Sequence, residues 1–200
     1  MTNHTAYHHG NLRAALVDEG LEQLERNGLD DLSLRALAES LGVSKTAPYR
    51  HFQTKRDLFS ALAAEGYSRF ADMLEEYEPK LMVLDPQRRM AEMQRIYAGF
   101  AQRQPELYRL MFSRLGNSLH SERCKVNAQR AFGVLVRFAE SLLSTGADSR
   151  ALALSIFASL HGWMTILMDD LIPPEVGVNV ENWEEFSVFP SFYCDTRCTV

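Results

Sequence analysis

The sequence SLRALAESLGVSKTAPYRHF, from Ser33 to Phe52, decides the fold of this chain. Four apolar residues in its first part recur at helical spacing and predict one buried stripe: Leu34, Leu37, Ala38 and Leu41. Gly42 follows at a position where helices commonly end in the left-handed conformation. Ser44 is a suitable N-cap for a second helix, with Pro48 in or just past its first turn. This order of helix, glycine turn and helix predicts a helix-turn-helix that binds DNA.

Basic residues are concentrated around this stretch. Between Ser33 and Arg56 the sequence places five basic residues against the single acid Glu39: Arg35, Lys45, Arg50, Lys55 and Arg56. The whole chain carries a net charge of −5. Because salt screens charges beyond about 10 Å, an acidic protein can still present a local basic patch to a phosphate backbone.

Length and composition limit the class of protein. With 200 residues, 46% of them hydrophobic, the chain can bury a core as one or two domains. It shows no charged-then-apolar leader and no uninterrupted apolar run of about 18 residues, so we expect a soluble, cytoplasmic protein without a membrane partner. Its three cysteines, Cys124, Cys194 and Cys198, are too few for a disulfide scaffold and fit a reducing compartment.

Every other segment that can be assigned also shows helical spacing. A first helix should begin near Gly10 or Asn11 and end at Asn27-Gly28. Thr54 and Asp57 resemble a capping box that starts a long connecting helix, which Pro79 should end.

The second half continues in the same way. Pro86 and Pro105 should begin new helices, and we expect breaks at Asn117-Ser118 and Thr145-Gly146. A last helix is predicted from Ser149 to Leu171, before Pro173-Pro174, and it is apolar on more than one face. Such a helix must be covered on all sides, which suggests a partner subunit. No useful alternating pattern predicts a strand, so the expected fold class is all-α.

Three segments carry a resemblance to a known family: YHHGNLRAAL (Tyr7–Leu16), LSLRALAESLGVSKTAPYRHF (Leu32–Phe52) and TKRDLFSALAAEGY (Thr54–Tyr67). Together they resemble the DNA-binding end of the TetR family of transcriptional regulators. The segment SLHGW also resembles the signature of the WHG ligand domain of one TetR branch, although no Trp precedes His161.

The resemblance implies an all-helical homodimer in two parts. A three-helix helix-turn-helix domain would occupy residues 1–53, followed by a connecting helix over 54–78. A helical effector-binding and dimerisation domain would occupy 79–200. The family implies a repressor that leaves a palindromic operator in double-stranded DNA when a small-molecule effector binds. No cofactor is implied.

The candidate DNA-binding residues lie at the tip of the second helix and at helix starts. Lys45, Thr46 and Ala47 can reach base edges in the major groove, whereas the residues that follow are better placed for phosphates. The full set is Ser33, Arg35, Ser44, Lys45, Thr46, Ala47, Tyr49, Arg50, His51 and Lys55. Alternatively, Tyr49 and Phe52 are core residues, and Arg50 is merely solvated.

The candidate effector-binding residues are mostly aromatic residues and methionines of the second half. They are Phe100, Tyr108, Met111, Phe112, Phe132, His161, Trp163, Met164 and Met168. Side chains of this kind at helical spacing are more often core than pocket, so both interpretations stay open. His161 needs a polar partner either in the core or in a ligand.

Other functions have less support in the sequence. No Gly-rich phosphate loop, G-x-S-x-G elbow or H-E-x-x-H motif indicates an enzyme. The adjacent His8 and His9 do not converge on one metal ion, so we expect no metal site. Cys194 and Cys198 are better explained as inert thiols than as a redox switch. A nucleoid-type or scaffold protein without an effector remains the third alternative, and the helix-turn-helix itself could bind protein.

Overall fold

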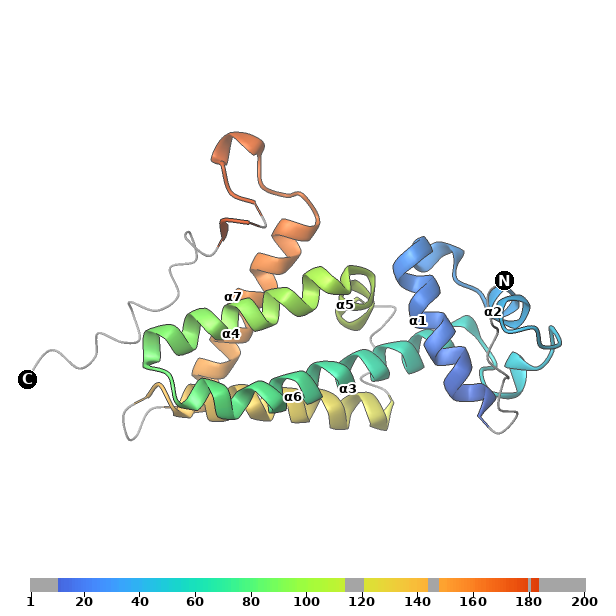
Figure 1. Cartoon of the computed structure of the whole chain (residues 1–200), viewed down its shortest axis with the longest axis horizontal. Helices are drawn as coiled ribbons and strands as arrows, with labels where there is room; N and C mark the ends of the chain where they lie inside the picture. Colours follow the sequence, from blue (N-terminus) through green and yellow to red (C-terminus); the bar gives the residue numbers. More distant parts are fainter. Residues whose placement is uncertain (1–10, 114–120, 144–147, 180, 184–200) are drawn as a thin grey trace, which may run out of the picture. The chain divides into compact units, whose positions relative to one another are not determined.

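A computed structural model of the chain describes residues 11–113, 121–143, 148–179 and 181–183 (Figure 1). Its elements are α1 (Leu12–Asp31), α2 (Leu34–Ser40), η1, a 3₁₀ helix (Pro48–Arg50), α3 (Lys55–Met82), α4 (Pro86–Arg103), α5 (Pro105–Phe112), α6 (Glu122–Glu140), α7 (Ser149–Met168) and η2, also 3₁₀ (Pro174–Val176). Within these ranges no residue is in a strand, so the all-α prediction is confirmed. The expected breaks at 117–118 and 145–146 lie outside the described residues.

The chain divides into two compact units. The first comprises the described residues of Met1–Gly66 and Glu106–Cys124, and the second those of Tyr67–Pro105 and Lys125–Val200. The division therefore falls inside α3, and α5 groups with α1 and α2 although α4 precedes it in the sequence. The domain limits inferred from the resemblance, at 53 and 79, stay predictions.

Local capping explains where the helices of the first unit begin and end. Asn11 accepts a hydrogen bond from the Ala14 N–H, and Ser33 Oγ accepts one from the Ala36 N–H at 3.1 Å. After α2, Gly42 has a φ of 65°, and the N–H of Val43 reaches back to the Ala38 carbonyl at 3.0 Å. These bonds confirm the predicted left-handed helix end.

Packing then buries one face of each of these helices. α2 and η1 pack on α1, and the large side chains that are fully buried here include Phe52 and six leucines: Leu16, Leu24, Leu32, Leu37, Leu58 and Leu62. α1 runs to Asp31, beyond its predicted end at Asn27-Gly28. Gly28 still interrupts it, with a φ of 76°, so the predicted break is a kink between two helical pieces.

The connecting helix α3 begins as predicted and ends later than predicted. The Asp57 carboxylate accepts a hydrogen bond from the Thr54 N–H at 2.8 Å, and Thr54 Oγ1 accepts one from the Asp57 N–H at 3.2 Å, which is the expected capping box. Pro79 does not end α3, which continues to Met82. Buried Arg89 of α4 explains the extension, because its guanidinium donates to the terminal carbonyls of Leu81 and Met82, both at 3.2 Å.

Arg89 also organises the rest of the second unit. Its guanidinium donates to the carbonyls of Leu84 at 2.8 Å and Ser141 at 3.1 Å, and so joins the ends of α3 and α6. Phe70 of α3 packs on α4, with its ring centroid 5.4 Å from that of Tyr97 and 4.9 Å from that of Phe100. α4 in turn packs against α7.

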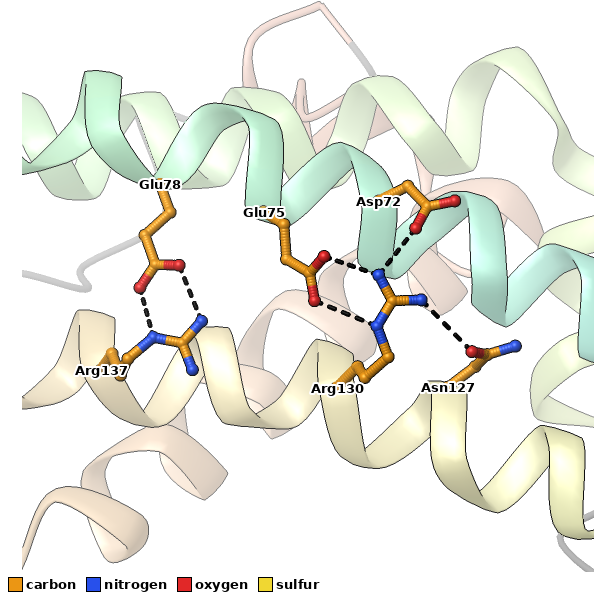
Figure 2. Close-up of polar contacts among 6 residues, drawn as sticks. All are labelled: Asp72, Glu75, Glu78, Asn127, Arg130 and Arg137. Carbon is orange, nitrogen blue, oxygen red and sulfur yellow. Dashed lines mark hydrogen bonds and ion pairs between the residues drawn. The ribbon is translucent and has the colours of Figure 1, made fainter.

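Ion pairs join the distal half of α3 to α6 (Figure 2). Arg130 donates to both carboxylate oxygens of Glu75, at 3.1 and 2.6 Å, and to Asp72 at 2.8 Å. Two turns along α6, Arg137 donates to both oxygens of Glu78. The two arginines of α6 face the three acids of α3. The spacing of these charges along each helix therefore sets how α3 and α6 align.

α7 ends three residues before its predicted limit. Asp170 takes a left-handed φ of 50°, and the Leu171 N–H bonds to the Ile166 carbonyl at 3.0 Å, which closes the helix. By length and composition alone α7 could cross a membrane, with 33% of its most apolar window buried. Core helices of soluble proteins pass the same test, so this property assigns no membrane span.

Candidate functional site

The predicted recognition helix, residues 44–52, forms a turn followed by the short 3₁₀ helix η1. Pro48 has no N–H and so cannot donate to the carbonyl four residues earlier, which prevents a regular α-helix here. The bonds within η1 span three residues: Arg50 N–H to the Ala47 carbonyl at 3.2 Å and His51 N–H to the Pro48 carbonyl at 2.9 Å, while the Phe52 N–H bonds four residues back to the Pro48 carbonyl at 3.0 Å. We call residues 44–51 the recognition segment.

Ser44 does not cap this segment as predicted. Ala47 occupies the N-cap position of η1 and makes no side-chain cap bond. The Ser44 hydroxyl lies 3.3 Å from Thr46 Oγ1 instead. Both hydroxyls are therefore on exposed residues at the tip of the turn, next to exposed Lys45.

Most of the recognition segment faces solvent. Ala47 is half-buried. Six side chains of the segment are exposed: Ser44, Lys45, Thr46, Tyr49, Arg50 and His51. Tyr49 is 52% exposed, so its interpretation as a core residue is wrong. Phe52, at 2% exposed, is a core residue, and the Arg13 guanidinium lies 5.3 Å from its ring centroid. Buried Pro48 and Phe52 thus anchor the exposed segment to the core of the first unit.

The remaining DNA-binding candidates lie at two helix starts in the same unit. Ser33 is occupied as the N-cap of α2, and Arg35 in the first turn is exposed. Lys55 is the first residue of α3, and its ammonium donates to the Asp30 carbonyl at 3.1 Å, 5.2 Å from the Phe59 ring centroid. Each position combines a basic or hydroxyl side chain with the positive end of a helix dipole, where anions are favoured.

The effector-binding candidates are split between the two units. Tyr108, Met111 and Phe112 are on α5 in the first unit, with the Tyr108 and Phe112 rings 4.9 Å apart. The second unit holds the other six: Phe100, Phe132, His161, Trp163, Met164 and Met168. Phe100 and Met164 are buried at 6% and 1% exposure, whereas the remaining four are half-buried.

His161 lies in a partly apolar environment on α7. Its ring stacks on that of Phe157, with centroids 5.6 Å apart and planes 9° from parallel. Partial burial lowers the pKa of His161 below its ordinary value, because the charged imidazolium loses hydration there. The Trp163 ring lies 5.9 Å from that of buried Trp183, so part of the aromatic tail packs on α7.

Three residues outside the predicted sets have unusual polar surroundings. Glu25 of α1 accepts hydrogen bonds from backbone N–H groups of α5, and buried Arg89 donates to four carbonyls. Gln104 leaves its buried Oε1 without a hydrogen-bond partner among the described residues. A local sequence pattern could not predict the contact of Glu25, because Glu25 and the N–H groups that it binds are about 80 positions apart in the chain.

The described residues contain no group of three or more His, Cys, Asp or Glu side chains that could hold a metal ion. His8, His9, Cys194 and Cys198 lie outside those residues. Cys124 is buried, with its thiol 3.6 Å from the Ser60 carbonyl oxygen.

Comparison with known proteins identifies both halves of the chain. Residues 16–62 match the family described as "Bacterial regulatory proteins, tetR family", and residues 90–179 match "Tetracyclin repressor-like, C-terminal domain". The class D tetracycline repressor protein of Escherichia coli is 40% identical over 60 residues, which cover 30% of this chain and 28% of that repressor. The chain therefore matches less than a third of the length of this relative.

Solved structures extend the likeness to the whole fold. A protein of unknown function from Rhodococcus sp. RHA1 has a TM-score of 0.67 at 29% identity, over 92% of this chain and 96% of that one. The regulator FadR from Bacillus subtilis, solved with stearoyl-CoA, has a TM-score of 0.63 at 16% identity, over 88% and 97%. The WHG subtype stays a prediction. Because both matched families are of the TetR or tetracycline-repressor type, the chain belongs to the TetR family of bacterial regulatory proteins.

Proposed function

We propose that this chain is a ligand-responsive transcriptional repressor that binds a palindromic operator as a homodimer. The observation that carries the proposal is the exposed recognition segment, in which Lys45, Thr46, Tyr49 and Arg50 are exposed around buried Pro48. A small cationic tip of this kind can enter a major groove about 12 Å wide.

Within the segment we assign two roles. Lys45 can donate to guanine O6 or N7, and the methyl groups of Thr46 and Ala47 can contact a thymine methyl. Tyr49, Arg50 and His51 are assigned to phosphates, together with Ser33, Arg35, Ser44 and Lys55 around them. The hydrogen bond from Lys55 to the Asp30 carbonyl fits this role, because it holds the ammonium at the start of α3.

The second half of the chain is proposed to bind the effector and to form the dimer. Its apolar and aromatic residues suit an apolar small molecule, and the FadR neighbour holds an acyl-CoA. α7 leaves Leu154 58% exposed and Ile166 38% exposed, which supports burial of this helix against a second copy. Such a protein would act in the cytoplasm and not as an enzyme, as the regulators that it resembles suggest.

Selection from a pool of random duplexes tests DNA binding directly. The enriched duplex should be a palindrome, bound in the nanomolar range at low salt, and its affinity should fall steeply as salt rises. Lys45→Ala should weaken binding by about tenfold or more, since a base contact is worth roughly 1–3 kcal/mol. Lys80→Ala, which removes an exposed lysine of the second unit, is the matched control and should bind like the wild type.

Two outcomes would contradict the proposal. One is a chain that is monomeric by light scattering at working concentration, and the other is indifference to every duplex at low ionic strength. For the effector, a thermal-shift screen that includes stearoyl-CoA and a broad metabolite set should yield a compound that raises the melting temperature and releases DNA. A scaffold protein without an effector would show neither response.

A further inference from the structure

The first turn of α5 is capped by a side chain from a distant helix. Glu25 of α1 accepts a hydrogen bond from the Leu107 N–H at 2.8 Å and one from the Glu106 N–H at 3.4 Å. Since α5 begins at Pro105, these are the second and third residues of the helix, whose N–H groups have no partner within it. An N-cap side chain normally satisfies them.

The local sequence does not supply that cap. Gln104, immediately before α5, has no short oxygen side chain to fold back, and its Oε1 is buried without a partner among the described residues. Pro105 contributes no N–H at all. The start of α5 therefore depends on the Glu25 carboxylate.

Burial and hydrogen bonding act in opposite directions on Glu25. The pKa of Glu25 is raised overall, because loss of hydration on burial outweighs the two N–H bonds from Leu107 and Glu106, which lower it. Two charged groups of α5 face the carboxylate: Glu106, which repels it, and Arg109, which attracts it. A carboxylate at a helix N-terminus also gains from the helix dipole.

α5 also packs on the part of α3 that belongs to the same unit. A Cβ atom at Gly66 would lie 2.6 Å from Met111 Sδ and 2.9 Å from Leu107 Cδ1, so α5 packs directly on the backbone of α3 there. α5 thus has contacts with α1 through Glu25 and with α3 through this glycine.

α1 reaches the recognition segment as well. Its first turn places the Arg13 guanidinium over the ring of Phe52, and η1 packs against the same helix. A shift of α1 would therefore disturb the cap of α5 and the support of the recognition segment together, because packed helices move as rigid elements.

We propose that Glu25 is a positioning residue that couples α5 to α1, so that DNA binding at the recognition segment changes the stability of the first turn of α5. This inference rests on the proposed function. Coupling between two sites is reciprocal, so the effect of α5 on DNA affinity must appear equally as an effect of DNA on α5. The test can therefore use DNA as the probe and needs no effector.

Hydrogen exchange of the Leu107 and Glu106 amides measures the cap in the full chain. In Glu25→Ala without DNA, these amides should exchange about fivefold faster than in the wild type, which is the usual effect of losing a cap. Glu25→Gln retains an acceptor oxygen and should lie between the two. Glu22→Gln is the matched control, because Glu22 is an exposed acid of the same helix that pairs with Arg26, and it should leave both amides unchanged. A cooperative thermal transition in each variant shows that it is folded.

The same amides are then followed with the selected duplex bound. In the wild type, DNA should change their exchange rate several-fold, and in Glu25→Ala that change should be lost. Equal exchange of Glu25→Ala and wild type in the free chain would overturn the role of Glu25, as would a change on DNA binding that persists in Glu25→Ala. If the proposed function is wrong, fluorescence anisotropy will show no binding of any duplex, which distinguishes this failure from a failure of the role of Glu25.

Discussion

The guanidinium of Arg130 lies against the carboxylate of Glu75 in a two-point contact, with N–O distances of 3.1 and 2.6 Å. The bonds to Glu75 raise the pKa of Arg130 further above its already high value, and the bond to Asp72 adds a smaller effect in the same direction. Planar two-point pairing of this kind fixes direction as well as distance. It joins α6 to the distal half of the connecting helix α3 (Figure 2).

Replacing Arg130 by Lys should therefore weaken the link between α3 and α6. A lysine keeps the charge and loses the fork that matches the carboxylate. We expect a lower melting temperature for Arg130→Lys, with the difference from wild type shrinking in 1 M NaCl, because the pair is partly exposed and screened by salt. Arg88→Lys is the control, since its pair with Asp85 is local and exposed. Equal melting of wild type and Arg130→Lys at low salt would contradict this.

Arg89→Met should destabilise the chain strongly. The substitution leaves the carbonyls of Leu81, Met82, Leu84 and Ser141 without their shared donor in a buried place. We expect a loss of about 2–4 kcal/mol in the free energy of unfolding, measured by urea denaturation. Arg88→Met, at the exposed neighbouring position, should change it by no more than about 0.5 kcal/mol. If Arg89→Met lowered the free energy of unfolding as little as Arg88→Met does, the four hydrogen bonds of Arg89 would not be stabilising.

Gly66→Ala tests the close packing of α5 on α3. Overpacking costs about 1–3 kcal/mol, and the better helix propensity of alanine returns about 1 kcal/mol. We expect net destabilisation in urea, which should be smaller in a Met111→Ala background, where the clash at 2.6 Å is removed and only the contact with Leu107 Cδ1 at 2.9 Å remains. Gly133→Ala, where only a guanidinium nitrogen lies within ordinary contact at 3.6 Å, should instead stabilise the chain. Additive effects of the changes at 66 and 111 would refute the contact.

The lowered pKa of His161 predicts a pH dependence of stability. The unfolded chain, with a histidine pKa of about 6.5, binds a proton more readily than the folded chain does. The stabilising contribution of His161 is thus fully present above that pKa and is lost as pH falls below it. Urea unfolding at pH 7.5 and 5.5 should show a smaller acid-induced loss in His161→Gln than in the wild type. An equal loss in both would exclude this histidine as a source.

Thr46 and Lys55 should differ in what they do to DNA binding. Thr46→Ser removes a methyl group that can contact a base, so we expect a change in the preferred sequence. Lys55→Ala removes a phosphate contact, so it should weaken binding to all duplexes alike and reduce the salt slope by about 1. Anisotropy on the selected duplex and on random DNA, at several salt concentrations, distinguishes the two. A uniform loss on both duplexes for Thr46→Ser would remove its assigned role.

The sequence by itself determined the features that depend on neighbours along the chain. The N-caps Asn11, Ser33 and Thr54, the left-handed Gly42 and the helix start at Pro86, which Asp85 caps, follow from bonds within a few residues. The all-α class follows from helical periodicity for the same reason. The place of the recognition segment in the sequence could be predicted, because Gly42 ends the helix before it and the Thr54 cap begins the helix after it.

Only the tertiary structure decided the contacts between distant segments. Pro79 fails to end α3 because Arg89 supplies donors to the carbonyls beyond it. α5 begins where it does with a cap from Glu25, more than 80 positions earlier. The exposure of Tyr49 and the burial of Trp183 likewise depend on what packs beside them. A one-dimensional pattern records which groups a helix offers, but the partner that each group meets is fixed by burial and hydrogen bonding across the folded chain.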